Sequence, residues 1–139
     1  MDDRSLGVFL TNMAIRTELT VRVQNMPGAL GRLCRVLADE HVNIIALSLE
    51  HAGTLHLLVD NPVHAAGLLR DRHYQVSERD VLYTVAPSGP GSLARIAALL
   101  AAEGVNLEYL YVTTVEDQAM AGVVAGVPDA VRASAAAGL

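Results

Sequence analysis

The sequence predicts an α+β fold in which two β-α-β-β-α-β units follow one another along the chain. The first observation is an internal repeat: residues 27–43 and 90–106 are identical at nine of seventeen aligned positions, at an offset of 63 residues. The second is that each copy follows an alternating apolar and polar stretch, which is typical of a strand, and itself has apolar residues at helical spacing. Two copies are too few for a stacked solenoid and indicate a duplicated domain.

The first unit opens with a strand and a helix. Residues 19–24 (LTVRVQ) alternate between apolar and polar side chains, the pattern of a half-buried strand. Residues 25–28 (NMPG) break this pattern with turn-forming residues. Apolar residues then recur at helical spacing, which predicts a helix from about Ala29 to Glu40.

A hairpin, a helix and a last strand complete this unit. Residues 42–50 and 55–59 are rich in β-forming residues around an Ala52–Gly53 turn. Asp60 or Asn61 then precedes Pro62, a combination that favours the start of a helix. A strand at about Tyr74–Glu78 follows, so the element order is the ferredoxin-like one.

The second unit repeats this order but lacks an obvious fourth strand. A strand is expected at Val81–Ala86, a hairpin over residues 105–125 and a helix that Pro128 opens. The apolar segment Leu6–Met13 has no place in either unit, so we expect it to supply the absent strand, either in its own chain or in a partner's. The predicted domains are an N-terminal extension (1–16), a first domain (17–79) and a second domain (80–139).

Composition restricts the function. The net charge is −5 and all ten basic residues are arginine, which disfavours nucleic-acid binding and leaves no lysine for a Schiff base or a Walker A loop. The single cysteine, Cys34, favours a reducing, cytoplasmic location. No segment has the roughly 20 apolar residues of a membrane span. Five histidines without convergent spacing predict no metal site.

Two segments carry a family resemblance. Residues 19–45, with N-M-P-G-A-L and H-V-N-I, and residues 82–107, with S-G-P-G-S-L and G-V-N-L, resemble the ACT domain. The resemblance covers nearly all of residues 17–137 and extends to small tandem ACT proteins that have no catalytic domain. It implies a non-catalytic regulatory protein that binds an amino acid at interfaces between paired domains, without a cofactor, and it favours a homodimer whose regulated partner the sequence does not identify.

The strand-to-helix loops are the candidate ligand sites. Free backbone N–H groups at a helix start favour a carboxylate, Gly28 permits close approach, and the Asn25 amide can both donate and accept. The resemblance adds the start of the second strand in each unit. The predicted ligand-binding residues are Asn25, Met26, Pro27, Gly28, Ala29, Leu30, Asn43 and Ile44 in the first unit, and Ser88, Gly89, Gly91, Ser92, Leu93, Asn106 and Leu107 in the second.

Other interpretations remain open from the residues alone. Each loop can be a plain tight turn, and each Asn can end the preceding helix in a left-handed conformation. Arg32, which matches Arg95 across the repeat, either faces solvent or binds a carboxylate. The whole protein can be an adaptor of this fold without a ligand. An acylphosphatase-like enzyme shares the element order, but its phosphate-loop pattern is missing at residues 23–26.

Overall fold

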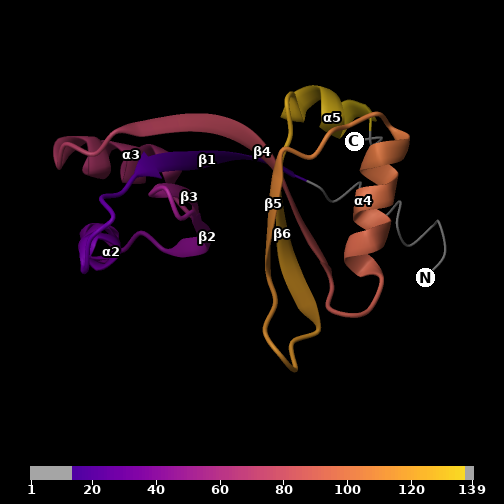
Figure 1. Cartoon of the computed structure of the whole chain (residues 1–139), viewed down its shortest axis with the longest axis horizontal. Coiled ribbons are helices and arrows are strands. Elements are labelled where there is room, and N and C mark those ends of the chain that lie inside the picture. The colour runs from indigo at the N-terminus through magenta and orange to yellow at the C-terminus, as the bar shows by residue number, and fades with distance from the viewer. Residues whose placement is uncertain (1–13, 137–139) are drawn as a thin grey trace. The chain divides into compact units, whose positions relative to one another are not determined.

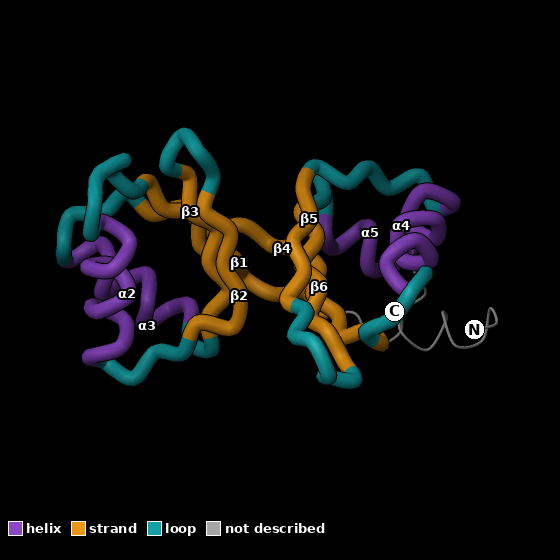
Figure 2. Tube along the Cα trace, turned by 60° about the horizontal axis from the view of Figure 1, so that its bottom comes forward, coloured by secondary structure: helices purple, strands orange, loops and turns teal. Residues whose placement is uncertain are grey.

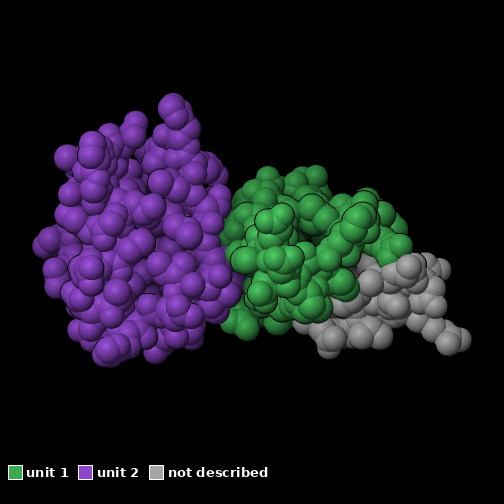
Figure 3. Space-filling model, turned by 90° about the horizontal axis from the view of Figure 1, so that it is seen from below, with its two compact units in different colours: residues 1–16, 80–139 green, residues 17–79 purple. Residues whose placement is uncertain are grey.

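The computed structural model describes residues 14–136, which contain six strands and four helices (Figure 1). These residues form two compact units, residues 17–79 and residues 14–16 with 80–136, which we call the first and the second module (purple and green in Figure 3). In chain order the elements are β1 (Ala14–Arg22), α2 (Ala29–Asp39), β2 (Ile44–Leu49), β3 (Thr54–Val59), α3 (Pro62–Asp71), β4 (Val76–Pro87), α4 (Ser92–Ala102), β5 (Tyr109–Thr113), β6 (Met120–Gly126) and α5 (Ala130–Ala136).

The first module is a sheet with the strand order β2-β3-β1-β4 and with α2 and α3 on one face (Figure 2). The antiparallel register places Leu19 opposite Leu57 and Val21 opposite Leu55. These four residues are fully buried under the helices, as is Leu33 of α2. The predicted α+β, ferredoxin-like element order is therefore confirmed here, since β1-α2-β2-β3-α3-β4 is the order that the periodicity indicated.

Glycine begins both long helices of the repeat, and a left-handed residue follows their last turn. Gly28 and Gly91 are the N-cap residues of α2 and α4, with φ of 84° and 88°. The helices end in the backbone pattern of a Schellman motif, with His41 (φ 58°) and Gly104 (φ 72°) in the left-handed region. The interpretation that Asn43 and Asn106 end these helices was therefore wrong, because the residues two positions earlier do so.

The second module has the strand order β1-β4-β6-β5 and a separate core under α4 and α5. Leu82 and Leu100 are almost completely buried in this core. Tyr109 and Tyr111 lie on the same side of β5, with ring centroids 6.4 Å apart and planes 10° apart. Aliphatic residues therefore fill the core while the tyrosines stack along the sheet.

As predicted, the second unit has no fourth strand of its own: among the described residues from 80 onward the strands are β4, β5 and β6. Strand β1 begins at Ala14, five residues before the predicted start at Leu19, and residues 14–16 belong to the second module. The Arg16 guanidinium carbon lies 4.9 Å from the ring centroid of Tyr83 in β4. These first residues of β1 fill the fourth position of the sheet. The segment Leu6–Met13, which we expected there, lies outside the described residues.

Strand β4 is also longer than expected, because it pairs with β1 on one side and with β6 on the other. The sequence predicted two strands, at about Tyr74–Glu78 and at Val81–Ala86, but Val76–Pro87 is one continuous strand. Arg70 at the end of α3 pairs with Glu78 at 3.6 Å and donates a hydrogen bond to the Val76 carbonyl. Pairing within the sheet thus outweighs the low strand propensity of a Glu-Arg-Asp run. Among the described residues, no helix is long and apolar enough to cross a membrane.

Candidate functional site

The loop between β1 and α2 is a tight turn that ends at an uncapped helix. The Ala29 N–H donates to the Met26 carbonyl at 3.3 Å, and the Arg32 N–H donates to the Gly28 carbonyl at 3.0 Å. No side chain caps α2, and its first turn contains no acidic residue. The partial positive charge at this helix start is therefore available to an anion.

This loop faces the β2–β3 hairpin across a cavity of about 100 Å³. The Val23 N–H donates to the Gly53 carbonyl at 2.8 Å, which ties the loop to the hairpin turn. Gly53 has φ of 90°, and a Cβ there would overlap the Val23 carbonyl oxygen, so only glycine permits this approach. The lining residues are Val23, Gln24, Asn25, Met26, Ala29 and Leu30 from the loop and helix, and Leu49, Glu50, His51 and Gly53 from the hairpin.

Glu50 gives this cavity a negative charge whose position is fixed by a buried histidine. Its Oε1 lies 3.2 Å from His56 Nε2, and His56 Nδ1 lies 3.1 Å from Glu18 Oε1. Glu18 has no exposed surface and His56 is 7% exposed, whereas the Glu50 side chain remains 53% exposed. The cavity therefore has a carboxylate on one side and a positive helix end on the other.

The other predicted residues of the first unit lie at the opposite end of α2. The Asn43 N–H donates to Asp60 Oδ1 at 3.0 Å, and the Asp60 N–H donates to the Asn43 carbonyl at 3.1 Å. Ile44 begins β2 and packs against the core. Since α2 has eleven residues, it separates Asn43 from the loop by about 16 Å, at about 1.5 Å per residue.

In the second module the predicted residues also fall in two places. The Ser88 N–H donates to the Ala119 carbonyl at 2.9 Å and the Ser92 N–H to the Gly89 carbonyl at 3.4 Å, so the loop is again a tight turn. Ser92 makes no capping hydrogen bond, and Leu93 is 44% exposed.

Asn106 instead lines a separate cavity of about 210 Å³, together with residues of the α5 start such as Asp129 and Arg132. Leu107 packs against the core of the second module. The structure therefore does not bring the Ser88–Leu93 loop and Asn106 into one cavity of the second module.

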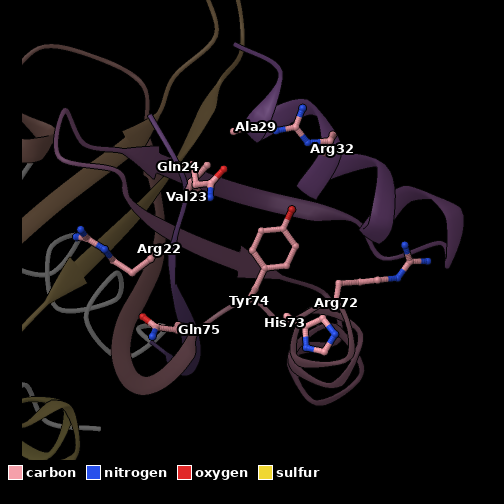
Figure 4. Close-up of a pocket in the computed structure, with 9 residues that line it drawn as sticks. All are labelled: Arg22, Val23, Gln24, Ala29, Arg32, Arg72, His73, Tyr74 and Gln75. Carbon is pink, nitrogen blue, oxygen red and sulfur yellow. The ribbon is translucent and has the colours of Figure 1, made fainter. Parts of the chain in front are cut away.

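A larger cavity, of about 440 Å³, shares Val23, Gln24 and Ala29 with the smaller one but is bounded by the α3–β4 loop instead of the hairpin (Figure 4). The residues that line it are Arg22, Val23, Gln24, Ala29, Arg32, Arg72, His73, Tyr74 and Gln75. Sequence reasoning missed the part from the α3–β4 loop and, in the smaller cavity, the hairpin residues Leu49, Glu50 and His51. For the larger cavity, the signal in the sequence was the match between Arg32 and Arg95 across the repeat. For the smaller cavity, it was the turn at Ala52–Gly53.

Residues 14–136 contain no cluster of three or more His, Cys, Asp or Glu side chains placed to hold a metal ion. The sites described above therefore rest on hydrogen-bonding groups, single charges and apolar walls. This arrangement suits the binding of a small polar molecule.

The chain resembles known proteins both in its sequence and in its fold. The family model described as "ACT domain" matches residues 17–63. The crystal structure of protein BT0572 from Bacteroides thetaiotaomicron is 30% identical, with a TM-score of 0.80 over 90% of this chain and 88% of that one. No curated protein matches the chain.

Two further solved structures share the fold. The regulatory subunit of aspartate kinase from Thermus flavus is 16% identical, with a TM-score of 0.65 over 91% of this chain and 92% of that one. The aspartokinase alpha and beta subunits are 19% identical, with a TM-score of 0.64 over 90% of this chain and 93% of that one.

Proposed function

Because the chain belongs to the ACT domain family, we propose that it is a non-catalytic regulatory protein that binds an amino acid at an interface between ACT domains. We include in this proposal that residues 17–79 and 80–139 are two tandem ACT units. The repeat, the glycines at equivalent N-caps and the fold shared with a regulatory subunit of aspartate kinase support it.

The observation that carries the proposal is the pair of opposite charges around the cavity at the β1–α2 loop. A zwitterionic amino acid needs a partner for its carboxylate and another for its ammonium group. The start of α2 suits the carboxylate, and Glu50 suits the ammonium group. Asn25 can hydrogen-bond to either, while Met26 and Leu30 provide apolar contact for a side chain.

The size of this cavity supports binding at an interface. Ligand pockets usually have about 300–1,000 Å³, whereas this cavity has about 100 Å³. A second surface must therefore cover most of the ligand. Asn43 and Ile44, at the far end of α2, become that surface when a second copy packs with its α2 antiparallel, an arrangement that two-fold symmetry allows. We propose a homodimer of this kind.

The proposal predicts a selective increase in thermal stability with one or a few amino acids. An amino acid at 100 times its Kd adds about 2.7 kcal/mol, which corresponds to a rise in Tm of about 10 °C for a chain of this length. Asn25→Ala should remove most of this rise, because it removes the amide from the cavity, whereas Gln118→Ala in the β5–β6 loop should retain it.

The measurement is a melting curve of the full chain with each of the twenty amino acids at millimolar concentration, with the mass in solution from light scattering. A flat set of melting temperatures would contradict the proposed ligand class. A rise that persists in Asn25→Ala would move the site away from this loop. A monomer in the presence of the active amino acid would contradict the proposed dimer interface.

A further inference from the structure

We propose that the first module has a second ligand site, the cavity of about 440 Å³ between the start of α2 and the α3–β4 loop, which binds a small molecule carrying at least two negative charges. We call it the basic cavity and define it by Arg22, Arg32, Arg72, His73 and Tyr74. Its volume lies within the usual range of ligand pockets, about 300–1,000 Å³. It goes beyond the proposed amino-acid site, whose other wall is the β2–β3 hairpin instead of the α3–β4 loop.

The charge of the basic cavity selects an anion. Its lining contains three arginines and no carboxylate, although the chain as a whole carries a net charge of −5. Arg22 donates to Thr54 Oγ1 at 3.2 Å. Among residues 14–136, neither Arg32 nor Arg72 has an ion pair with an acidic side chain. Two guanidinium groups are thus placed in one cavity without the counter-charges that surface arginines often have.

Arg32 and Arg72 face the cavity from different elements. Arg32 Nη1 lies 3.1 Å from the position that a Cβ on Gly28 would occupy, so its guanidinium rests against the helix start. The Tyr74 hydroxyl points toward the space between Gln24 and Arg32, and the Arg72 guanidinium lies on the other side of the ring (Figure 4). The lining of the cavity therefore includes two cations, a hydroxyl and an amide.

An adjoining cavity of about 380 Å³ extends the basic surface. It shares Arg32, Arg72 and Tyr74 with the basic cavity and adds Arg35. Asp39, the one carboxylate in its lining, lies 4.0 Å from Arg35. Asp39 thus pairs with a fourth arginine, Arg35, and leaves Arg32 and Arg72 for a ligand.

The backbone of the α3–β4 loop is fixed before a ligand binds. His73 adopts φ of 68°, its N–H donates to the Arg70 carbonyl at 2.9 Å, and the Tyr74 N–H donates to the Leu69 carbonyl at 3.0 Å. Tyr74 also packs against the core of the module. A ligand therefore needs to order only the ends of the arginine side chains, which reduces the entropic cost of binding.

These features identify the chemical class of the ligand. Guanidinium groups bind carboxylate and phosphate oxygens with two parallel hydrogen bonds, and two such groups favour a ligand with two negative charges. A free amino acid is disfavoured here, because no acidic side chain in the lining receives its ammonium group. A dicarboxylate and a phosphate monoester share the required chemistry.

The test is calorimetric titration of the full chain in low-salt buffer without added amino acid, so its result does not depend on the proposed amino-acid site. The probes are succinate, inorganic phosphate and, as a single-charge control, acetate. We expect succinate or phosphate to bind, and acetate not to bind at the same concentration. Binding of succinate alone identifies a dicarboxylate ligand, and binding of phosphate alone identifies a phosphorylated one.

Variants locate the binding. Arg32→Gln and Arg72→Gln should each weaken it by a factor of about ten or more, since each removes a charge-assisted contact. Tyr74→Phe keeps the ring in the core and should weaken it by less. Arg95→Gln is the matched control, because Arg95 occupies the position of Arg32 in the second copy of the repeat.

Two results would overturn the inference. One is the absence of binding by both succinate and phosphate. The other is an equal loss of affinity in Arg32→Gln, Arg72→Gln and Arg95→Gln, which indicates general attraction to positive charge rather than a site. Circular dichroism and melting of each variant establish that it is folded.

Discussion

Glu18 is a carboxylate with no exposed surface in a strand that otherwise packs aliphatic side chains. Its Oε1 contacts His56, and His56 in turn contacts Glu50 at the rim of the proposed amino-acid site. A buried carboxylate is costly unless it is hydrogen-bonded. The histidine therefore stabilises the fold through Glu18 and positions Glu50 for a ligand.

His56→Leu tests the first of these roles. It removes a partner of a buried carboxylate, so the free energy of unfolding should fall by about 2 kcal/mol or more. His64→Leu is the matched control, because the His64 side chain is 44% exposed and lies 4.0 Å from an exposed carboxylate of Glu40. Urea unfolding of both variants measures the difference, and similar losses would contradict a special role for His56.

For single residues, the sequence predicted the face of the strand on which a side chain lies better than it predicted what surrounds that side chain. The alternation over residues 19–24 indicated which side chains face the helices, and Leu19 and Val21 are fully buried there. It did not indicate that Glu18 is buried, because a period of two separates the two faces of a strand without showing what covers the second one. Arg32 was ambiguous because the α3–β4 loop, which lines the same cavity, comes from a distant part of the sequence.

Glycines in strand β6 make room for aromatic side chains. A Cβ on Gly126 would overlap the ring of Tyr109, and one on Gly122 would lie 3.1 Å from the Tyr83 hydroxyl. Gly126 is directly opposite Tyr109 in the antiparallel register of β5 and β6. The side chains of Tyr109 and Tyr83 therefore pack against the backbone of β6 at these two glycines.

Gly126→Ala should destabilise the protein by about 1–3 kcal/mol, because the new methyl group must displace the Tyr109 ring. Gly67→Ala is the matched control: Gly67 lies within α3, nothing is found within 4 Å of its added Cβ, and alanine favours a helix by up to about 1 kcal/mol. Thermal melting should therefore give shifts of opposite sign. A stabilising effect of Gly126→Ala would contradict the packing described for β6.

A helix or strand could be predicted from the sequence where residues close to its ends determine its bounds. Helix α3 begins at Pro62 with the Asn61 side chain as its cap, as the sequence indicated, because a cap and a proline act within one turn. The extensions of β1 to Ala14 and of β4 through Asp80 were missed, because distant strand pairing determines them. The same applies to the candidate site: its loop was visible in the sequence, but its hairpin wall was not.

At the scale of the whole molecule, β1 and β4 each contribute residues to both modules. Residues 14–16 of β1 lie in the second module, whereas the rest of the strand lies in the first. The repeat predicted two units from the sequence. The sequence did not predict this sharing, because we assigned the absent strand to Leu6–Met13 and gave the strand at residues 19–24 to the first unit alone.

A chain that begins at Thr17 tests the contribution of residues 14–16. It loses strand pairing beside β4, so the second module should lose about 1–3 kcal/mol of stability, at about 1 kcal/mol per hydrogen bond. Hydrogen exchange over residues 80–87 measures this locally, and a chain that begins at Ala14 is the matched control. Equal protection in both chains would contradict the role of β1 in the second module.

Shared strands also limit how such a protein can be rearranged by recombination. A crossover or an inserted domain between Arg79 and Asp80 would interrupt β4 within its sheet, although the repeat in the sequence suggests a natural boundary there. The exposed turn at residues 115–118 between β5 and β6 is a better point for an insertion, since it lies outside both strands. Recombination that leaves both modules folded must therefore transfer the two units together, even though the repeat indicates that they arose by duplication of one unit.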